Sequence, residues 1–143
     1  MATDRHAEVT WRGSLMDGNG SIDSVGSGAF GPLDITWASR AEEPGGRTSP
    51  EELIAAAHAA CVSMALSHRL ADAGTPPEQL QTTATVTFQP GEGITKVALA
   101  IRGTVPGLDE DAFREAAEDA KANCPVSKAL GGVPEITLDA SPA

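Results

Sequence analysis

Aromatic side chains and positive charges are both scarce in this chain. Aromatic residues make up 3 % of the 143 positions and tyrosine is absent, so Ala, Val, Leu and Ile must build the core. Ten basic residues face 20 acidic ones, which gives a net charge of −10. This balance argues against binding to nucleic acid or to an anionic membrane surface, because both need a basic patch.

Long apolar runs are also missing. We expect no membrane span, because no run approaches the roughly 20 residues that a spanning helix needs. Residues 1–9 are polar and contain no signal-peptide core. The sequence therefore predicts a cytoplasmic protein. In that compartment its two cysteines are not expected to form a permanent disulfide, although a redox cycle could join them transiently.

The pattern of apolar residues predicts one α+β domain over residues 1–143, without repeats or a linker. Strands are expected where β-branched and apolar residues alternate with polar ones, at 6–12, 20–25, 33–39, 81–88, 94–105 and 135–138. Helices are expected from a capping residue to a glycine or a break in the apolar pattern, at 49–73, 109–122 and just after Cys124.

The helix that follows residue 49 has the strongest start signal in the chain. Ser49 can cap it, Pro50 suits its first turn, and Glu52 completes a capping box. From Leu53 to Leu66 it is apolar on nearly every side, which is typical of a helix enclosed by other structure. One short sheet cannot cover such a helix, so we infer a symmetric dimer in which each subunit covers the central helix of the other.

The two cysteines have different local surroundings. Cys124 precedes Pro125 at a predicted helix start, where backbone N–H groups and the helix dipole favour a thiolate. Cys61 lies mid-helix among alanines, where burial should raise its pKa unless a charge reaches it from elsewhere. Local chemistry alone therefore predicts that Cys124 is the reactive thiol and that Cys61 is a small buried apolar residue.

The residues around the two cysteines also allow other interpretations. His58 lies three residues before Cys61, and a Cys–His pair would indicate a thiol hydrolase, although this spacing rarely suits proton transfer. A zinc site of Cys61, His58 and Cys124 lacks the paired-ligand spacing of such sites. Glu51 has a structural explanation as a first-turn acid. It lies ten residues before Cys61, or about 15 Å along a helix, so it could serve that thiol only if the helix bends or a partner subunit supplies it.

Two long segments resemble the signatures of the OsmC/Ohr family of organic hydroperoxide reductases. The first comprises Thr48–Ile54 and Ala56–Cys61, and the second is Asn123–Leu130. His58 and Val126 resemble the OsmC branch rather than the Ohr branch. Shorter matches cover much of the remaining chain: Trp11 with Gly13, Val105–Gly107 and Glu135–Asp139.

The resemblance implies an intertwined homodimer in which antiparallel sheets wrap around buried central helices, with the active sites at the interface. It makes Cys61 the peroxidatic thiol and Cys124 the resolving thiol, which replaces the local ranking. A glutamate, matching Glu51, holds the arginine that activates the first thiol. Arg40, expected at the end of the third strand, matches that arginine, and Arg47 is the second candidate.

The resemblance also implies a thiol peroxidase that defends against oxidative or osmotic stress. Cys61 would reduce an organic, fatty hydroperoxide to its alcohol and become a sulfenic acid, Cys124 would form a disulfide with it, and a lipoyl-type dithiol would reduce that bridge. No cofactor or metal is implied. The alternative function is a non-catalytic module that binds a lipid or another hydrophobic ligand in the same apolar pocket.

Overall fold

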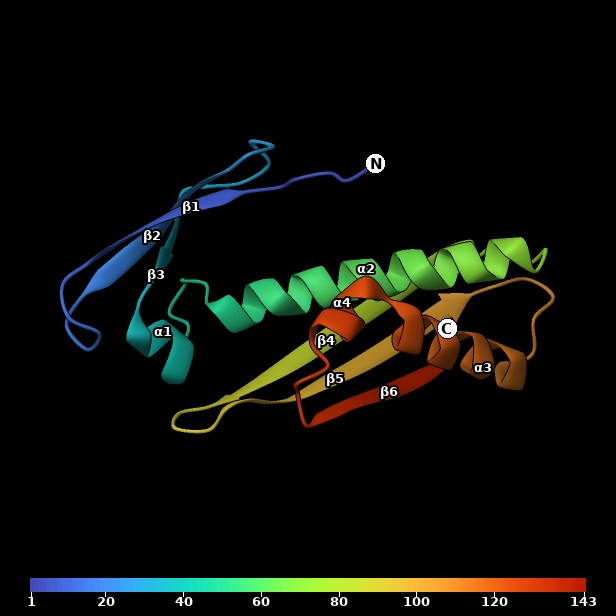
Figure 1. The fold of residues 1–143 in the computed structure, drawn as a ribbon. Coiled ribbons are helices and arrows are strands. Elements are labelled where there is room, and N and C mark those ends of the chain that lie inside the picture. The colour runs from blue at the N-terminus through green and yellow to red at the C-terminus, as the bar shows by residue number, and fades with distance from the viewer. The chain divides into compact units, whose positions relative to one another are not determined.

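A computed structural model describes residues 1–143 and has an α+β architecture with two three-stranded sheets (Figure 1). The strands are β1 (Ala7–Arg12), β2 (Asn19–Val25), β3 (Leu33–Ile35), β4 (Gln79–Gln89), β5 (Gly93–Thr104) and β6 (Glu135–Pro142). The helices are α1 (Trp37–Ala41), α2 (Pro50–Asp72), α3 (Glu110–Asn123) and α4 (Pro125–Ala129).

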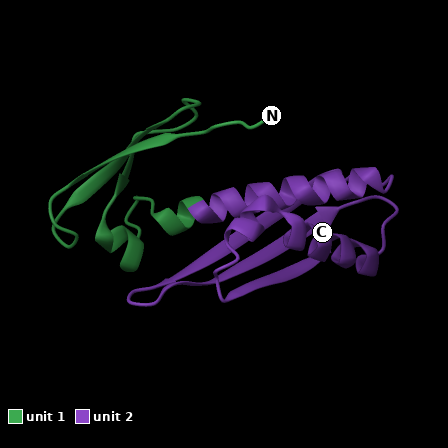
Figure 2. Ribbon diagram, in the orientation of Figure 1, with its two compact units in different colours: residues 1–53 green, residues 54–143 purple.

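The chain divides into two compact units, residues 1–53 and residues 54–143 (Figure 2). The division falls inside α2, so one continuous helix contributes its first turn to the first unit and the rest to the second. The interpretation of residues 1–143 as a single domain stays a prediction.

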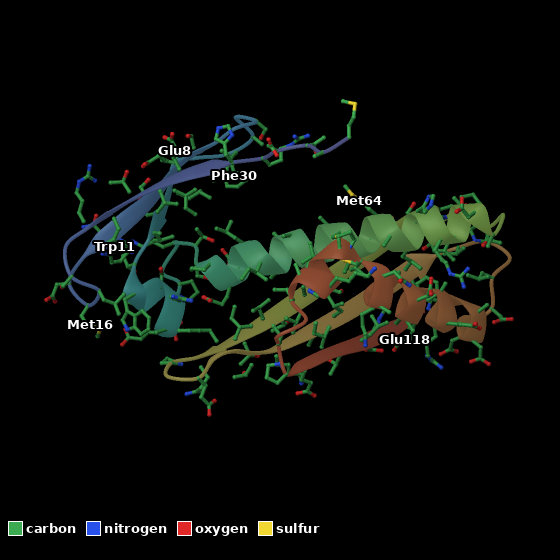
Figure 3. All side chains as sticks on the ribbon, in the orientation of Figure 1. Glu8, Trp11, Met16, Phe30, Met64 and Glu118 are labelled. Atoms are coloured by element: carbon green, nitrogen blue, oxygen red, sulfur yellow. The ribbon has the colours of Figure 1, made fainter.

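The first unit contains an antiparallel sheet in the order β1-β2-β3, which confirms the predicted strands near residues 6–12 and 20–25. This sheet has almost no core of its own, because Ile22 is its one buried apolar side chain. Trp11, Met16 and Phe30 are exposed (Figure 3). An apolar surface of this kind is typical of a sheet that is covered by another part of an assembly.

The prediction of a strand over residues 33–39 is wrong in its second half. The strand β3 ends at Ile35, and α1 begins at Trp37, so Arg40 lies on a helix rather than at a strand end. The reason is a reciprocal capping box. The Thr36 side chain accepts a hydrogen bond from the Ser39 N–H, and the Ser39 hydroxyl accepts one from the Thr36 N–H, both at 3.0 Å.

The helix α2 begins and ends as predicted. The Ser49 hydroxyl accepts a hydrogen bond from the Glu52 N–H at 3.1 Å, and the helix ends just before Gly74, whose φ is +85°. The predicted capping box is wrong in one half. The Glu52 carboxylate does not return to Ser49 but accepts a hydrogen bond from the Thr48 hydroxyl at 2.8 Å.

The second sheet has the order β4-β5-β6 and is mixed, which corrects the expectation of antiparallel sheets only. Strands β4 and β5 form the predicted antiparallel hairpin, whereas β6 pairs with β5 in parallel. The reason is the connection between β5 and β6. It passes through α3 and α4, and a helical crossover of this kind returns the chain in its original direction. β6 also extends to Pro142, beyond the predicted end at 138.

The helices of the second unit cover one face of its sheet (Figure 1). Alternate residues of β5 are buried and join one apolar cluster with α2 and α3: Val62, Leu66, Leu70, Val97, Leu99, Ile101 and Phe113. Gly103 is required at the point where α3 meets the sheet. A Cβ atom there would lie 2.5 Å from the ring of Phe113, so the bare backbone lets this ring pack closely.

The central helix is not enclosed within one chain. Its buried stripe follows His58, Val62, Leu66 and Leu70, whereas Ala56, Ala57 and Ala60 are exposed on another side. Met64 is 73 % exposed and points away from the sheet (Figure 3). This agrees with the expectation that one short sheet cannot cover the helix, and the inferred dimer stays a prediction.

The expectation that no segment could cross a membrane also needs correction. By length and composition alone, the 23 residues of α2 meet that criterion, with 22 % of the apolar window buried. The many alanines raise the mean hydropathy of the helix without producing a long unbroken run of large apolar residues. Core helices of soluble proteins pass the same test, so this finding is weak evidence for a membrane span.

A candidate thiol site and an arginine–glutamate pair

The two cysteines meet in the second unit of the same chain. Cys61 lies in α2, and Cys124 is the residue that immediately precedes α4. Both are free thiols, and their side chains are within hydrogen-bonding reach of each other. Cys61 is partly buried and Cys124 is completely buried. The fold thus brings together two sulfur atoms that lie far apart in the sequence.

The surroundings of Cys61 disfavour its thiolate. Burial raises the pKa of Cys61, and the hydrogen bond with Cys124 and the charge on that sulfur raise it further. A hydrogen bond from the Val126 backbone lowers the same pKa but does not outweigh the other causes. The expectation that burial raises the pKa of Cys61 is confirmed.

The surroundings of Cys124 favour its thiolate. Burial acts to raise the pKa of Cys124, but hydrogen bonds from Cys61, from the backbone and side chain of Ser127, and from the Val126 backbone bring it below its ordinary value. The two backbone groups belong to the first turn of α4, as the predicted helix start requires. The prediction of a lowered pKa at Cys124 is confirmed.

Arg40 and Glu51 form a two-pronged ion pair in the first unit. The Arg40 Nε atom lies 3.0 Å from Oε1 of Glu51, and the Arg40 Nη2 atom lies 2.9 Å from Oε2. The residue Glu51 is only 6 % exposed, and a buried carboxylate of this kind needs a cationic partner with matched geometry. The predicted pairing of Glu51 with Arg40 is present.

The structure also separates the two candidate arginines. Arg47 is exposed in the loop before α2, whereas Arg40 is half-buried and holds Glu51. The capping box of α1 and the first turn of α2 set the two charged groups opposite each other, because Ser39 also donates a hydrogen bond to the Thr48 carbonyl at 3.0 Å. The short helix α1 is therefore tied to the segment that begins α2.

An apolar cavity of about 310 Å³ adjoins Arg40 in the first unit. Its walls include Trp11, Leu15, Ile35 and Trp37. Sequence reasoning missed this cavity, although its signal was present in the two tryptophans, which are rare in this chain. A larger, open hollow near Arg5 and Phe30 contains neither cysteine nor Arg40.

His58 is paired with a residue that the sequence did not single out. Its Nε2 atom lies 2.7 Å from the hydroxyl oxygen of Ser127, and its Nδ1 atom is buried without a hydrogen-bond partner. The signal that could have found Ser127 is its position three residues after Cys124, where side chains return to the helix start. No group of three or more His, Cys, Asp or Glu residues is placed to hold a metal ion.

Comparisons with known proteins agree with this arrangement. The OsmC-like protein family matches residues 43–139. Peroxiredoxin OsmC of Escherichia coli is 42 % identical over 142 residues, which cover 97 % of this chain and 96 % of that protein. The chain belongs to the OsmC-like family.

Solved structures show the same OsmC/Ohr architecture. The organic hydroperoxide resistance protein OhrB of Bacillus subtilis is 26 % identical, with a TM-score of 0.67 over 95 % of this chain and 98 % of that one. An organic hydroperoxide resistance protein from Elizabethkingia anophelis is 24 % identical, with a TM-score of 0.71 over 100 % of both chains. The second likeness concerns the fold alone.

Proposed function

We propose that this chain is a cysteine-based peroxidase that reduces organic hydroperoxides to alcohols in stress defence. Peroxidase activity comes with the OsmC-like family, whose relatives are named peroxiredoxin and organic hydroperoxide resistance protein. The single observation that supports the mechanism is the meeting of two free thiols within one chain. A disulfide between them needs no second subunit.

The proposed reaction has two oxidative steps. The Cys61 thiolate attacks the distal oxygen of the hydroperoxide, the O–O bond breaks, and the alkoxide takes up a proton to leave as an alcohol. Cys61 then carries a sulfenic acid. The Cys124 sulfur attacks the Cys61 sulfur, the S–O bond breaks, and the hydroxyl group leaves as water. A dithiol of the lipoyl type reduces the resulting bridge by exchange.

Cys61 needs help from a cation, because the groups around it in its own unit raise its pKa. We assign this role to Arg40, oriented by Glu51. The helix α2 is uninterrupted from Pro50 to Asp72, so a bend does not bring Glu51 to Cys61, and their ten-residue spacing corresponds to about 15 Å. We therefore assign the arginine–glutamate pair to the site of a second copy.

The second copy belongs to an intertwined homodimer. Two apolar surfaces support this assembly: the exposed side of α2 around Met64, and the first sheet, whose apolar side chains are largely exposed. In a dimer each subunit would cover the central helix of the other, which removes both surfaces from water. A cytoplasmic location and the lipoyl-type reductant belong to the same proposal.

The apolar cavity beside Arg40 supports an organic substrate. An alkyl or aryl group of the peroxide would contact Trp11, Leu15 and Trp37 while its oxygens approach the guanidinium. A small polar peroxide such as hydrogen peroxide would gain nothing from these walls. We therefore assign fatty or aryl hydroperoxides as the substrate class.

The test compares Cys61→Ser and Cys124→Ser with the parent protein. Cys61→Ser should abolish consumption of cumene hydroperoxide, whereas Cys124→Ser should complete one oxidation and accumulate a sulfenic acid that dimedone traps. Mapping of the oxidised parent protein without reductant should find one Cys61–Cys124 bridge within a chain. Unchanged turnover in Cys61→Ser would remove Cys61 from the peroxidatic role. A parent protein that binds the peroxide without consuming it would favour the hydrophobic-ligand module instead.

A further inference from the structure

A buried histidine–serine pair lies beside the thiol site, and the proposed reaction does not use it. His58 is completely buried in α2, and its Nε2 atom contacts the Ser127 hydroxyl oxygen at 2.7 Å. The other ring nitrogen, Nδ1, has no hydrogen-bond partner. A buried polar ring with an unsatisfied atom costs free energy, so its presence needs an explanation.

The unsatisfied nitrogen decides the direction of the hydrogen bond. Burial lowers the pKa of His58, so the ring is neutral and carries one proton. A proton on Nδ1 would be a buried donor without an acceptor, and such orphaned N–H groups are rare. The proton therefore belongs on Nε2, which donates it to the Ser127 oxygen.

The Ser127 hydroxyl proton is then directed to another acceptor. Ser127 is the third residue of α4, so its backbone N–H and its hydroxyl face Cys124 at the start of that helix, and both favour the Cys124 thiolate. With its oxygen accepting from His58, the hydroxyl has its proton left to direct towards the sulfur. This gives a continuous path from the His58 ring through the Ser127 hydroxyl to Cys124.

We propose that Ser127, polarised by His58, is a positioning residue that directs its hydroxyl proton to the sulfur of Cys124 and holds that sulfur in place for attack on Cys61. The resolving role of Cys124 rests on the proposed function, whereas the ionisation of its thiol does not. In the resolving step the Cys124 thiolate attacks the Cys61 sulfur, the S–S bond forms, the S–O bond of the sulfenic acid breaks, and the leaving hydroxyl takes up a proton and departs as water. When a dithiol reduces the bridge, the same hydroxyl stabilises Cys124 as the leaving thiolate.

The titratable group that faces Cys124 from α2 is Cys61, and no acidic or basic side chain contributes to the pKa of Cys124 or of His58. A test must therefore remove Cys61 from the titration. In the full-length Cys61→Ser protein, ultraviolet absorbance of the thiolate as a function of pH reports the ionisation of Cys124 alone.

Ser127→Ala in this Cys61→Ser protein should weaken the acidity of the Cys124 thiol by about tenfold, since a hydrogen bond to a charged group is lost. Ser127→Thr retains the hydroxyl and should restore most of the acidity. His58→Leu should move the titration in the same direction by a smaller factor. Ser63→Ala is the control, because it removes a partly buried hydroxyl elsewhere in the same unit, one that hydrogen-bonds with the Thr82 hydroxyl.

An unchanged Cys124 titration in a folded Ser127→Ala or His58→Leu protein would overturn the proposal, as would equal shifts in the Ala and Thr variants. With Cys61 present, Ser127→Ala should also prolong the lifetime of the dimedone-trapped sulfenic acid after cumene hydroperoxide. A parent protein that does not consume peroxide, together with the expected titration shifts, would contradict the proposed function and leave this inference intact.

Discussion

Cys61 and Cys124 influence each other's ionisation, yet their surroundings move their pKa values in opposite directions. Burial acts on both thiols, but only Cys124 has enough donors around it to lower its pKa against that burial. The proposed resolving sulfur thus has a pKa lowered within its own unit, while the proposed peroxidatic sulfur would need a guanidinium from elsewhere. Activation of Cys61 would then depend on assembly, which would limit oxidation of the unassembled chain.

The buried His58 should make the free energy of unfolding depend measurably on pH. Burial holds the pKa of His58 below its ordinary value of 6.5, so the unfolded chain takes up a proton that the folded protein does not. Above pH 6.5 the ring is neutral in both states, so His58 does not lower the free energy of unfolding. As the pH falls from 6.5 towards the pKa of the folded state, only the unfolded chain takes up the proton, and the free energy of unfolding decreases. The loss should reach up to about 1.4 kcal/mol per pH unit.

Urea unfolding at about pH 7.5 and about pH 5.5 measures this effect at one fixed protein concentration. His58→Gln should show a smaller decrease in unfolding free energy between the two conditions than the parent protein, since glutamine takes up no proton. Carboxylates titrate in both proteins, so the difference between them isolates the histidine. Equal decreases in the two proteins would contradict a neutral buried ring.

At the scale of elements, two helix starts set the arginine–glutamate pair. The helix α1 exists because Thr36 and Ser39 cap each other, and α2 begins where Ser49 accepts the Glu52 N–H. Each cap satisfies backbone N–H groups that a helix start leaves open. The position of Arg40 therefore depends on α1, a helix of only five residues. The backbone hydrogen bonds of so short a helix are too few to stabilise the helix without the cap.

Thr36→Val should lower the free energy of unfolding by about 1 kcal/mol, because valine keeps the shape of threonine but loses the hydroxyl that caps α1. Peroxide turnover should fall together with the stability, since Arg40 is then held less firmly against Glu51. Thr36→Ser is the control and should retain most of both. Denaturant unfolding and cumene hydroperoxide consumption measure the two effects, and a valine variant as stable and active as the serine variant would contradict this role of the cap.

At the scale of the whole molecule, the single chain has too little cover for its apolar surface. The first unit has one buried apolar side chain, and the central helix leaves Met64 73 % exposed. Exposed apolar surface of this extent is typical of an interface rather than of a monomer. The same dimer that buries this surface would bring an arginine to each Cys61, so assembly and activity are expected to be lost together.

Met64→Lys should weaken the dimer, because it places a charge in the proposed interface at the cost of its desolvation. Light scattering during gel filtration should find a lower mass at micromolar concentration, and peroxide consumption should fall with the dimer fraction. Glu118→Gln is the control, since it changes the net charge equally at an exposed position on α3 (Figure 3). A Met64→Lys protein with parental mass and turnover would contradict an interface on this side of α2.

Local patterns in the sequence were sufficient for most elements. The start and end of α2, the cap of α3 at Asp109 and the strands β1, β2, β4 and β5 follow from residues close together in the chain, because capping, turn formation and alternation act over a few positions. The end of β3 was missed because the Thr36 side chain caps a helix where the alternation of apolar residues predicts a continuing strand. The alternation itself does not show which of the two structures is more stable.

The sequence by itself determined the family, the two cysteines with their contrasting local chemistry, and the pairing of Glu51 with an arginine. Only the tertiary structure decided that the thiols meet within one chain, that Arg40 rather than Arg47 holds Glu51, that β6 runs parallel to β5, and that Ser127 pairs with His58. The physical reason is the separation in sequence of the residues that make contact. Helix starts and periodicity depend on neighbours in sequence, whereas these contacts depend on how distant segments pack, which no local pattern encodes.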